Sequence, residues 1–458
     1  MHVAVERICQ RAGVALCAIF VLGLAQVAAA SSFCVDPSAK NGCYSTISDA
    51  LSHAAAHDII NVGPGTYKEE IDIAFPVSIL GSGASATVID ATDLAHGFFV
   101  DGFDHPGLND VTIAGFAVRN ALYEGILVVS ASDVTIRDNR IENNDQVPGI
   151  QFTGQLTGCP NQPGNGTYET DETGDCGGGL HLVGAANAIV SGNLIAGNAD
   201  GILISDETAE SHDNLITHNI IKDNPAECGI VLASHPPSGK TDTLPPHNGV
   251  DRNTISFNLS HANGVTVGGS GVGLFTDGAG QGRVSGNVII GNTLTNNGLG
   301  GVALHTHVGP AFGLPADDMS NNQILSNVIA GNLADEEDTA TPGRVGININ
   351  SGRGGSPVIG TVIAQNVIRD EDIDVAVNTP AEVDVHLNDL FGQKIGVGNV
   401  CAFDGASICT GTVDATQNFW GCRFGPGGSK CSTVSGANVR FSPWLRAPIH
   451  DNDDNDNQ

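Results

Sequence analysis

Short segments of alternating apolar and polar residues fill most of the chain, and two motifs mark where they recur. The first is Asn-x-h, where h is apolar, and it is found at Asn139, Asn193, Asn219, Asn258, Asn292, Asn327 and Asn366. Four of these have a second asparagine five residues earlier, at Asn214, Asn253, Asn287 and Asn322. The second motif, Gly-h-x-h, follows most of them, at Gly201, Gly229, Gly301 and Gly346 among others. The shortest full period is 26 residues, from Asn193 to Asn219, and longer periods indicate loop insertions.

This pattern predicts an all-β fold, a single-stranded parallel β-helix in which each repeat is one coil of short strands. No repeat can bury its apolar face alone, whereas parallel stacking places each Ile or Val on its equivalent at about 4.8 Å per coil. Asparagine suits the bends, because it tolerates a left-handed backbone and its amide can bond the amides above and below. The absence of a 3.6-residue period excludes a helical solenoid, and the absence of long antiparallel strands with aromatic signatures disfavours a propeller.

The two ends of the chain carry segments that differ from the repeat and predict caps. Residues 45–57 form an amphipathic helix with Ile47, Leu51, Ala54 and Ala55 on one face, placed to plug the first coil. Near the other end, the segments 418–422 and 441–445 hold the two tryptophans and predict an aromatic lid. We therefore divide the chain into a signal peptide, an N-terminal cap, the coils, a C-terminal cap and a disordered acidic tail, at residues 1–30, 31–57, 58–400, 401–447 and 448–458.

The N-terminal residues indicate export. Charged residues, an apolar run from about Ala12 to Val27 and a small-residue end predict cleavage near Ala30 and a secreted protein, extracellular or periplasmic. Four close cysteine pairs then predict disulfides that pin loops and both ends: Cys34 with Cys43, Cys159 with Cys176, Cys401 with Cys409, and Cys422 with Cys431. The remaining Cys228 is expected to be a buried small apolar residue.

Charge limits the classes of partner. The formal net charge of −31 repels nucleic acid and anionic membranes, so neither is expected as a partner. It also repels acidic polysaccharides unless a divalent cation bridges the two. Acidic clusters at 335–338 and 370–372 make calcium a candidate ion, although such clusters are commonly solvated turns. We expect a monomer.

The first coil and the C-terminal segment resemble one known family. Residues 58–67, 70–73 and 79–83 resemble the opening of bacterial right-handed parallel β-helix proteins of the pectin-lyase-like superfamily, and residues 418–426 and 441–445 resemble their closing segment. The resemblance implies a right-handed coil. It leaves the activity open, because the fold hosts lyases, hydrolases, epimerases, adhesins and accessory proteins. The motif sets of polygalacturonases, pectate lyases and alginate epimerases are not present as sets.

Most loop insertions begin just after the fourth residue that follows the Gly of Gly-h-x-h. The side chains at this fourth position point outward and form a column along the β-helix, so we expect a groove beside that column. With Asp277 and His305 aligned on consecutive coils, a carboxylate would orient an imidazole as a general base, and His307 would share the face. This alignment requires choosing between Gly271 and Gly273 as the start of the motif. We predict Asp277, His305 and His307 as catalytic residues and the following as substrate-binding residues: His235, Asp317, Asp318, Asn350 and Arg353.

Three functions remain open at this point. The column beside long loops favours a carbohydrate-active enzyme that binds or modifies a polysaccharide by elimination, hydrolysis or epimerisation. The missing motifs favour a non-catalytic glycan-binding or structural protein. The pair of His305 and His307, which would need a third ligand such as His235, Asp277 or Asp317, is compatible with a periplasmic metal-handling accessory protein.

Overall fold

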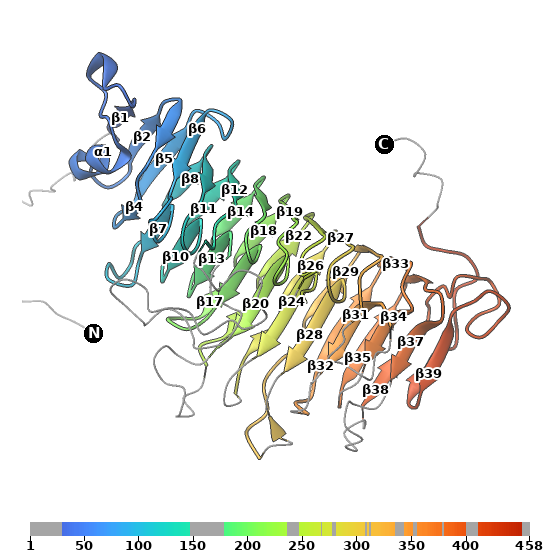
Figure 1. Ribbon diagram of the computed structural model, residues 1–458. Helices are drawn as coiled ribbons and strands as arrows, with labels where there is room; N and C mark the ends of the chain where they lie inside the picture. The colour runs from blue at the N-terminus through green and yellow to red at the C-terminus, as the bar shows by residue number, and fades with distance from the viewer. Residues whose placement is uncertain are drawn as a thin grey trace, which may run out of the picture.

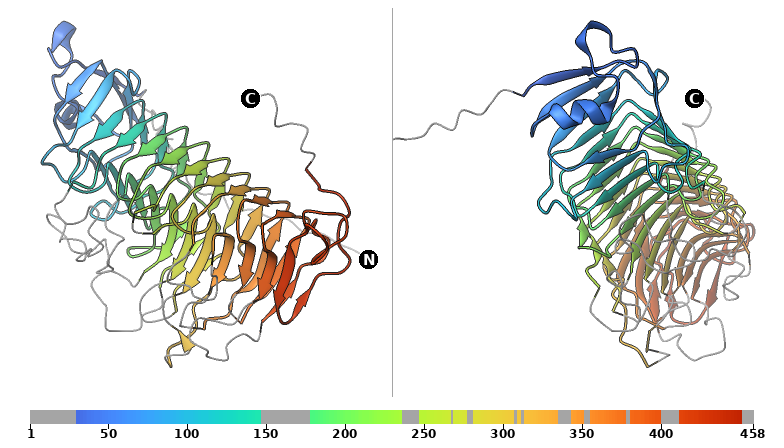
Figure 2. Two further views of the ribbon diagram at one scale, coloured as in Figure 1. Left: turned by 45° about the vertical axis from the view of Figure 1, so that its right-hand side comes forward. Right: turned by 60° about the vertical axis from the view of Figure 1, so that its left-hand side comes forward.

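A computed structural model shows a stack of coils that forms one elongated parallel β-helix (Figure 1). Each coil runs through one strand of sheet C, one of sheet A and one of sheet B before it climbs to the next coil. Every pair of neighbouring named strands is parallel, and Figure 2 shows the same stack from two other sides. The structure describes residues 30–146, 178–235, 247–266, 268–276, 281–306, 309–310, 313–334, 343–350, 355–377, 380–399 and 411–450.

The predicted fold class is thereby confirmed, and three long sheets make up the described coils. Sheet A consists of β1 (Ser32–Val35), β2 (Asp58–Val62), β5 (Val77–Gly81), β8 (Thr112–Ala114), β11 (Thr135–Arg137), β14 (Ile189–Ser191), β18 (Leu215–Thr217), β22 (Thr254–Ser256), β26 (Val288–Ile290), β29 (Gln323–Leu325), β32 (Ile359–Ala364), β35 (Glu382–His386), β38 (Thr412–Asp414) and β40 (Val439–Arg440). Sheet B consists of β3 (Gly65–Tyr67), β6 (Thr87–Asp90), β9 (Ala117–Arg119), β12 (Arg140–Glu142), β15 (Leu194–Ala196), β19 (Ile220–Lys222), β23 (Leu259–His261), β27 (Thr293–Thr295), β30 (Val328–Ala330), β33 (Val367–Arg369) and β36 (Asp389–Phe391).

Sheet C carries the candidate site. It consists of β4 (Ile71–Ile73), β7 (Phe98–Asp101), β10 (Ile126–Val129), β13 (Leu180–Val183), β16 (Ile202–Ser205), β20 (Ile230–Ser234), β24 (Val272–Thr276), β28 (Val302–Thr306), β31 (Val345–Asn350), β34 (Ile373–Val377), β37 (Ile395–Asn399) and β39 (Thr433–Gly436). A short fourth sheet joins β17 (Ser211–His212), β21 (Val250–Asp251) and β25 (Val284–Ser285) between sheets C and A.

The core is a set of apolar columns that run along the axis of the β-helix. On sheet A, for example, Ile216 lies between Val190 and Ile255 on the neighbouring coils, and all three are fully buried. On sheet C, Ile202 and Ile204 join the main core, whereas Leu203 belongs to a separate cluster on the other face. The predicted alternation of inward and outward positions after the Gly of Gly-h-x-h is therefore correct.

Asparagine ladders fix the bends of the coils, as predicted. In the ladder between sheets A and B, Asn219 donates from its backbone N–H and its Nδ2 to Oδ1 of Asn258, at 2.9 and 3.0 Å. The same pairing links Asn139, Asn193, Asn219, Asn258, Asn292, Asn327, Asn366, Asn388 and Asn418. The asparagines five residues earlier form their own ladder through Asn214, Asn253, Asn287 and Asn322. Because these amides are buried, each bond satisfies groups that water cannot reach.

A further ladder, between sheets B and C, runs through Asn144, Asn198, Asn224, Asn263, Asn297 and Asn332. It ends at Glu371, whose Oε1 accepts from the backbone N–H and from Nδ2 of Asn332, both at 3.0 Å. Burial of Glu371 raises the pKa of its carboxyl to about 7. A carboxyl group thus occupies the place where the repeat would put another amide.

The N-terminal cap contains a helix that is shorter than predicted. Helix α1 (Ile47–His53) begins after Thr46, whose side chain accepts from the N–H of Asp49, and it packs against β1, β2 and β4. Its buried face consists of Ile47, Ala50 and Leu51. The prediction that Ala54 and Ala55 extend this face was wrong, because the backbone is already extended at Ala54.

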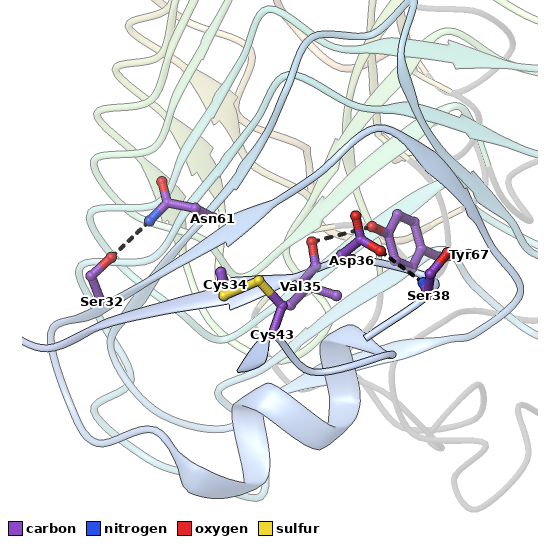
Figure 3. Close-up of a disulfide and its surroundings, with 8 residues drawn as sticks. All are labelled: Ser32, Cys34, Val35, Asp36, Ser38, Cys43, Asn61 and Tyr67. Carbon is purple, nitrogen blue, oxygen red and sulfur yellow. Dashed lines mark hydrogen bonds between the residues drawn. A yellow bond between two sulfur atoms is a disulfide. The ribbon is translucent and has the colours of Figure 1, made fainter. Parts of the chain in front are cut away.

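Two of the four predicted disulfides are present in the described residues. Cys34 of β1 is bonded to Cys43, and near this bond Ser32 of the same strand accepts from Nδ2 of Asn61 in β2 at 2.9 Å (Figure 3). Cys422 is bonded to Cys431 beside the buried Trp420 of the C-terminal cap.

The other cysteines divide into two groups. The predicted bonds of Cys159 with Cys176 and of Cys401 with Cys409 stay predictions, because all four residues lie outside the described part of the chain. Cys228 is buried, as predicted, and its Sγ accepts from the N–H of Ser270 at 3.0 Å.

Residues 1–29 of the predicted signal peptide and residues 451–458 of the predicted acidic tail also lie outside the described residues. In the part of the chain that is described, no helix has the length and apolar character needed to cross a membrane.

Candidate functional site

The outward face of sheet C carries the column on which the predicted site depends. From one coil to the next, the register aligns Val183, Ser205, Ala233, Phe275, His305 and Asn350. These residues lie four places after their repeat glycines, as predicted, with one difference from the prediction. The structure has Phe275 in place of Asp277.

The alignment of Asp277 with His305 was wrong. Strand β24 pairs Val272 with Val302 and Phe275 with His305, which makes Gly271 rather than Gly273 the start of the motif. Gly273 instead faces outward, where the ring of Phe275 fills the space that a Cβ at this position would need. Asp277 itself lies outside the described residues, as do His307 and Arg353.

Phe275 and His305 form an edge-to-face ring pair on adjacent strands. Their ring centroids lie 6.1 Å apart with an interplanar angle of 66°. Both side chains are half-buried, whereas Ala233 before them and Asn350 after them are buried. The column therefore places one aromatic ring and one imidazole, each half-buried, on the outward side of sheet C.

A buried ion pair lies beside this column. Glu207 and His235 each follow the Gly of their motif by six residues, so they stack on consecutive coils. Oε1 of Glu207 lies 2.8 Å from Nδ1 of His235, and each side chain is 1% exposed. This places the predicted residue His235 against a carboxylate that the sequence analysis did not single out.

Asp206 accepts hydrogen bonds from several groups around His235. Its Oδ1 accepts from the backbone N–H of His235 at 2.7 Å, and its Oδ2 accepts from Oγ of Ser234 at 3.0 Å and from the N–H of Gly249. Ser234 Oγ also lies 3.0 Å from Nδ1 of His247. One carboxyl group therefore holds the side chain of Ser234 and the backbone N–H groups of His235 and Gly249.

The two neighbouring carboxyl groups titrate in opposite directions. Burial raises the pKa of Asp206 to about 7, and the nearby charge of Glu207 acts in the same sense. Burial also acts to raise the pKa of Glu207, but the charge and the hydrogen bond of His235 outweigh it and leave this pKa lowered. Glu207 is thus the ionised partner and Asp206 the protonated one over much of the acidic range.

The network continues toward the N-terminus through His181. Its Nε2 lies 2.8 Å from Oγ of Ser205, and its Nδ1 lies 3.8 Å from Oε1 of Glu124. The other oxygen of Glu124 lies 2.8 Å from Nδ1 of His96. All four side chains are buried, so alternating acidic and imidazole groups line this face of sheet C over several coils.

The predicted aspartates Asp317 and Asp318 have different surroundings. Asp317 is buried; its Oδ1 accepts from the N–H of Gly282 at 2.9 Å and its Oδ2 from Oγ of Ser356 at 3.1 Å. It therefore lies near the end of β24, since a Cβ on Gly282 would meet both Thr276 and Asp317. Asp318 is exposed and its Oδ1 accepts from the N–H of Ser320. Asp317 thus belongs to the surroundings of the column, and Asp318 points into a neighbouring turn.

The acidic cluster at 370–372 has other roles in the structure. Glu371 ends an asparagine ladder, and Asp372 lies 3.0 Å from Nζ of Lys394. The cluster at 335–338 lies outside the described residues.

Glu124, His181 and Glu207 were missed by the sequence analysis. The available signal was equal spacing from the repeat glycine. His96 and Glu124 each precede their glycine by one residue, and Glu207 and His235 each follow theirs by six. Equal offsets place side chains on top of one another in a β-helix, which is what the structure shows.

Comparisons with known proteins agree with the fold. Residues 82–241 match the family model of the right-handed beta helix region, and residues 175–353 match that of the periplasmic copper-binding protein NosD. A search of curated protein sequences finds no match.

Solved structures are similar over most of the chain. The catalytic domain of a GH87 alpha-1,3-glucanase in complex with tetrasaccharides matches with a TM-score of 0.55 and 13% identity, over 86% of this chain and 66% of that one. The catalytic unit of the GH87 alpha-1,3-glucanase from Streptomyces thermodiastaticus strain HF3-3 matches with a TM-score of 0.50 and 17% identity, over 88% and 66%. The A-module of the Azotobacter vinelandii mannuronan C-5 epimerase AlgE6 matches with a TM-score of 0.48 and 14% identity, over 88% and 93%. At these identities the likeness concerns the fold alone.

Proposed function

Because the chain is a right-handed parallel β-helix protein of the pectin-lyase-like type, we propose that it is an exported protein that binds a polysaccharide along the outward face of sheet C and modifies it by acid–base chemistry. The observation that carries this proposal is the half-buried pair of Phe275 and His305 on adjacent strands of that face. Export is supported by the two disulfides, which are typical of proteins that fold in an oxidising compartment.

The chemistry of the pair suits a sugar ring. The face of Phe275 offers an apolar surface for the C–H groups of a pyranose, and polar groups beside it can fix the orientation of the ring. In this proposal His305 is the acid–base residue, whereas Asn350 on the next coil is buried and is not proposed to contact the sugar. The buried pair of Glu207 and His235 acts as a positioning element, because both side chains are closed off from solvent.

Charge favours a neutral polysaccharide. The formal net charge of the chain is −31. A polyuronate would be repelled unless a divalent cation lay between the chains. The substrate class we favour is therefore a neutral glycan such as an α-1,3-glucan, ahead of a polyuronate.

The test is a screen of purified protein on neutral and acidic polysaccharides, with binding, released reducing ends and the ultraviolet absorbance of unsaturated uronates measured together. Phe275→Ala should weaken binding, and His305→Gln should abolish turnover while binding is retained. A matched control exists, because His218 and Phe257 form another ring pair on the turns between sheets A and B, with centroids 5.3 Å apart. His218→Gln and Phe257→Ala should leave both readouts unchanged.

The outcomes separate the alternatives. Binding that Phe275→Ala weakens, without turnover on any polymer, would make this a non-catalytic glycan-binding protein. No binding to any polysaccharide, or equal effects of the two pairs of variants, would overturn the proposal.

A second candidate function is copper handling, and one observation favours it. The match to the periplasmic copper-binding family covers residues 175–353, which contain Glu207, His235 and His305. Imidazole and carboxylate groups are suitable ligands for Cu²⁺. Copper that copurifies with the protein and is lost in both His235→Gln and His305→Gln, together with no binding to polysaccharides, would favour this function over the first.

A further inference from the structure

Three potential metal ligands meet on the outward face of sheet A, far along the chain from Phe275 and His305. They are Asp384 and His386 of β35 and Asp414 of the neighbouring strand β38. Within the described parts of the chain, their ligand atoms form a group that could hold a metal ion, and all of these atoms lie within 4.8 Å of one another. The alternation of the strands places them there, because the intervening residues are buried in the core: Val383, Val385 and Val413.

The imidazole of His386 is oriented as a metal ligand would be. Its Nδ1 lies 2.9 Å from the backbone oxygen of Thr416, so Nδ1 carries the hydrogen and donates it to that carbonyl. This leaves the lone pair on Nε2, the atom that lies 3.8 Å from Oδ1 of Asp384. That separation is too long for a hydrogen bond. It is close to the spacing of two atoms that bind one ion at about 2.0–2.2 Å each.

Thr416 also orients the carboxylate of Asp414, the third potential ligand. Its backbone N–H and its Oγ1 both donate to Oδ1 of Asp414, at 3.1 and 2.8 Å. One residue therefore orients both the imidazole and a carboxylate, through its carbonyl and its hydroxyl. Hydrogen bonds of this kind, from a second layer of residues, are typical of metal sites in proteins.

The charges at this place are incompletely balanced by protein groups. Asp384 and Asp414 are directly opposite each other in the register of β35 and β38, and like charges in that relation repel. Arg440 of β40 forms an ion pair with Asp414 from the other side, but its side chain is 71% exposed. Asp384 has no such partner in the adjacent strand β32, where the paired residue is Val362. A divalent cation between the two carboxylates would remove their repulsion.

We propose that Asp384, His386 and Asp414 bind a divalent transition-metal ion of the zinc type. One imidazole and two carboxylates match Zn²⁺ and its neighbours, whereas Ca²⁺ and Mg²⁺ prefer oxygen ligands alone. The site lies outside residues 175–353, so it is independent of the copper-handling candidate and of the polysaccharide site on sheet C. Arg440 competes with the ion for Asp414, and its side chain has to turn away into solvent when the ion binds.

The experiment is a titration of the chelator-treated, purified protein with Zn²⁺ against a chromophoric competitor, together with the absorption spectrum of the Co²⁺-loaded protein. The wild type should bind Zn²⁺ at this site, and His386→Gln and Asp384→Asn should each lose one equivalent and change the Co²⁺ spectrum. Thr416→Val keeps the carbonyl but removes the hydroxyl, and should weaken binding by about 10–100-fold. Arg440→Gln should tighten binding, which a merely structural role of the cluster would not produce. Ca²⁺ should not displace Zn²⁺.

The controls keep the result interpretable. His218→Gln removes an exposed imidazole elsewhere and should leave the stoichiometry unchanged. Thermal unfolding of every metal-free variant checks that the coil is intact. Equal stoichiometry and equal Co²⁺ spectra in the wild type and in His386→Gln, or loss of affinity in Arg440→Gln, would overturn the proposal.

Discussion

The carboxylate of Glu207 and the imidazole of His235 form a closed ion pair on consecutive coils, with Oε1 2.8 Å from Nδ1. Because both side chains are 1% exposed, bulk water does not solvate the pair. The charge and the hydrogen bond of His235 are the main causes that keep the pKa of the buried Glu207 lowered. This relationship leads to the first prediction.

His235→Ala should lower the free energy of unfolding by about 3–5 kcal/mol, because it removes the main group that stabilises the buried Glu207 carboxylate and leaves only the weaker interactions with Ser205 and His181. Chemical denaturation at neutral pH measures the loss. The double variant Glu207→Gln/His235→Ala should recover part of it, since no buried charge then remains. His53→Ala, at an exposed position of helix α1, serves as a control and should have little effect. A loss below about 1 kcal/mol in His235→Ala would mean that the pair is not closed in solution.

Asp206 predicts a pH dependence of stability. Its pKa is raised to about 7 in the folded protein, against 3.8 for the unperturbed group, so the folded state retains a proton that the unfolded state has lost between these values. The contribution of Asp206 to stability therefore falls as the pH rises from about 4 to about 7. Asp206→Asn should flatten the profile of melting temperature against pH over this range. The substitution should also lower the free energy of unfolding by about 1–3 kcal/mol at low pH, because one of the groups that donate a hydrogen bond to Asp206 loses its acceptor. An unchanged slope in Asp206→Asn would contradict the prediction.

Glu371 should be a site where a neutral replacement stabilises the protein. The pKa of this buried carboxyl is raised to about 7 from 4.5, so its contribution to stability is lost as the pH rises through this interval. Glu371→Gln keeps an oxygen to accept from Asn332 and carries no charge. Its melting temperature should exceed that of the wild type at about pH 8 and approach it at about pH 5. The matched variant is Glu382→Gln, at an exposed position of β35, which should show no such crossover.

Substitution of a ladder asparagine should destabilise the protein far more than substitution of an exposed asparagine. Asn258 accepts two bonds from Asn219 and donates to Asn292 and to the carbonyl of Ile216. Asn258→Ala leaves several buried groups without partners, each at a cost of about 1–3 kcal/mol. We expect a large drop in melting temperature, measured by circular dichroism. Asn61→Ala, at an exposed position on sheet A, should change it by only a few degrees. Equal effects of the two substitutions would show that the ladder amides contribute little.

The sequence was sufficient to predict the coils, because apolar periodicity and the asparagine bends both follow from stacking. Asn219 and Asn258 could be placed on one ladder from their motif alone, and Ile202 and Ile204 could be assigned to the interior from strand alternation. The bonds of Cys34 with Cys43 and of Cys422 with Cys431 followed from proximity in the chain. The same argument predicts the bonds of Cys159 with Cys176 and of Cys401 with Cys409, which the described residues do not test.

The register at β24 was predicted wrongly, although the motif itself distinguishes the two choices. Gly271 and Gly273 differ by two residues, and a shift of two keeps every side chain on the same face of the strand. Gly271 satisfies Gly-h-x-h with Val272 and Leu274, whereas Gly273 would put the polar Thr276 at the second apolar position. The pairing of Phe275 with His305 confirms Gly271 as the start of the motif. Contacts between coils with insertions of different length, such as that of Asp384 with Asp414, depend on the same three-dimensional register.

The ladder that ends at Glu371 has an electrostatic consequence. Along this row, the side-chain oxygen of each asparagine from Asn198 to Asn332 accepts from the asparagine of the preceding coil, so the C=O dipoles point the same way along the axis and add. The donor end of this row carries partial positive charge, as the first turn of an α-helix does. At Glu371 the hydrogen bonds from Asn332 at this end act to lower the pKa of the carboxyl, although burial outweighs them and leaves the pKa raised. The β-helix is thus electrically polar along its length, and its C-terminal end is the one at which this row favours an anion.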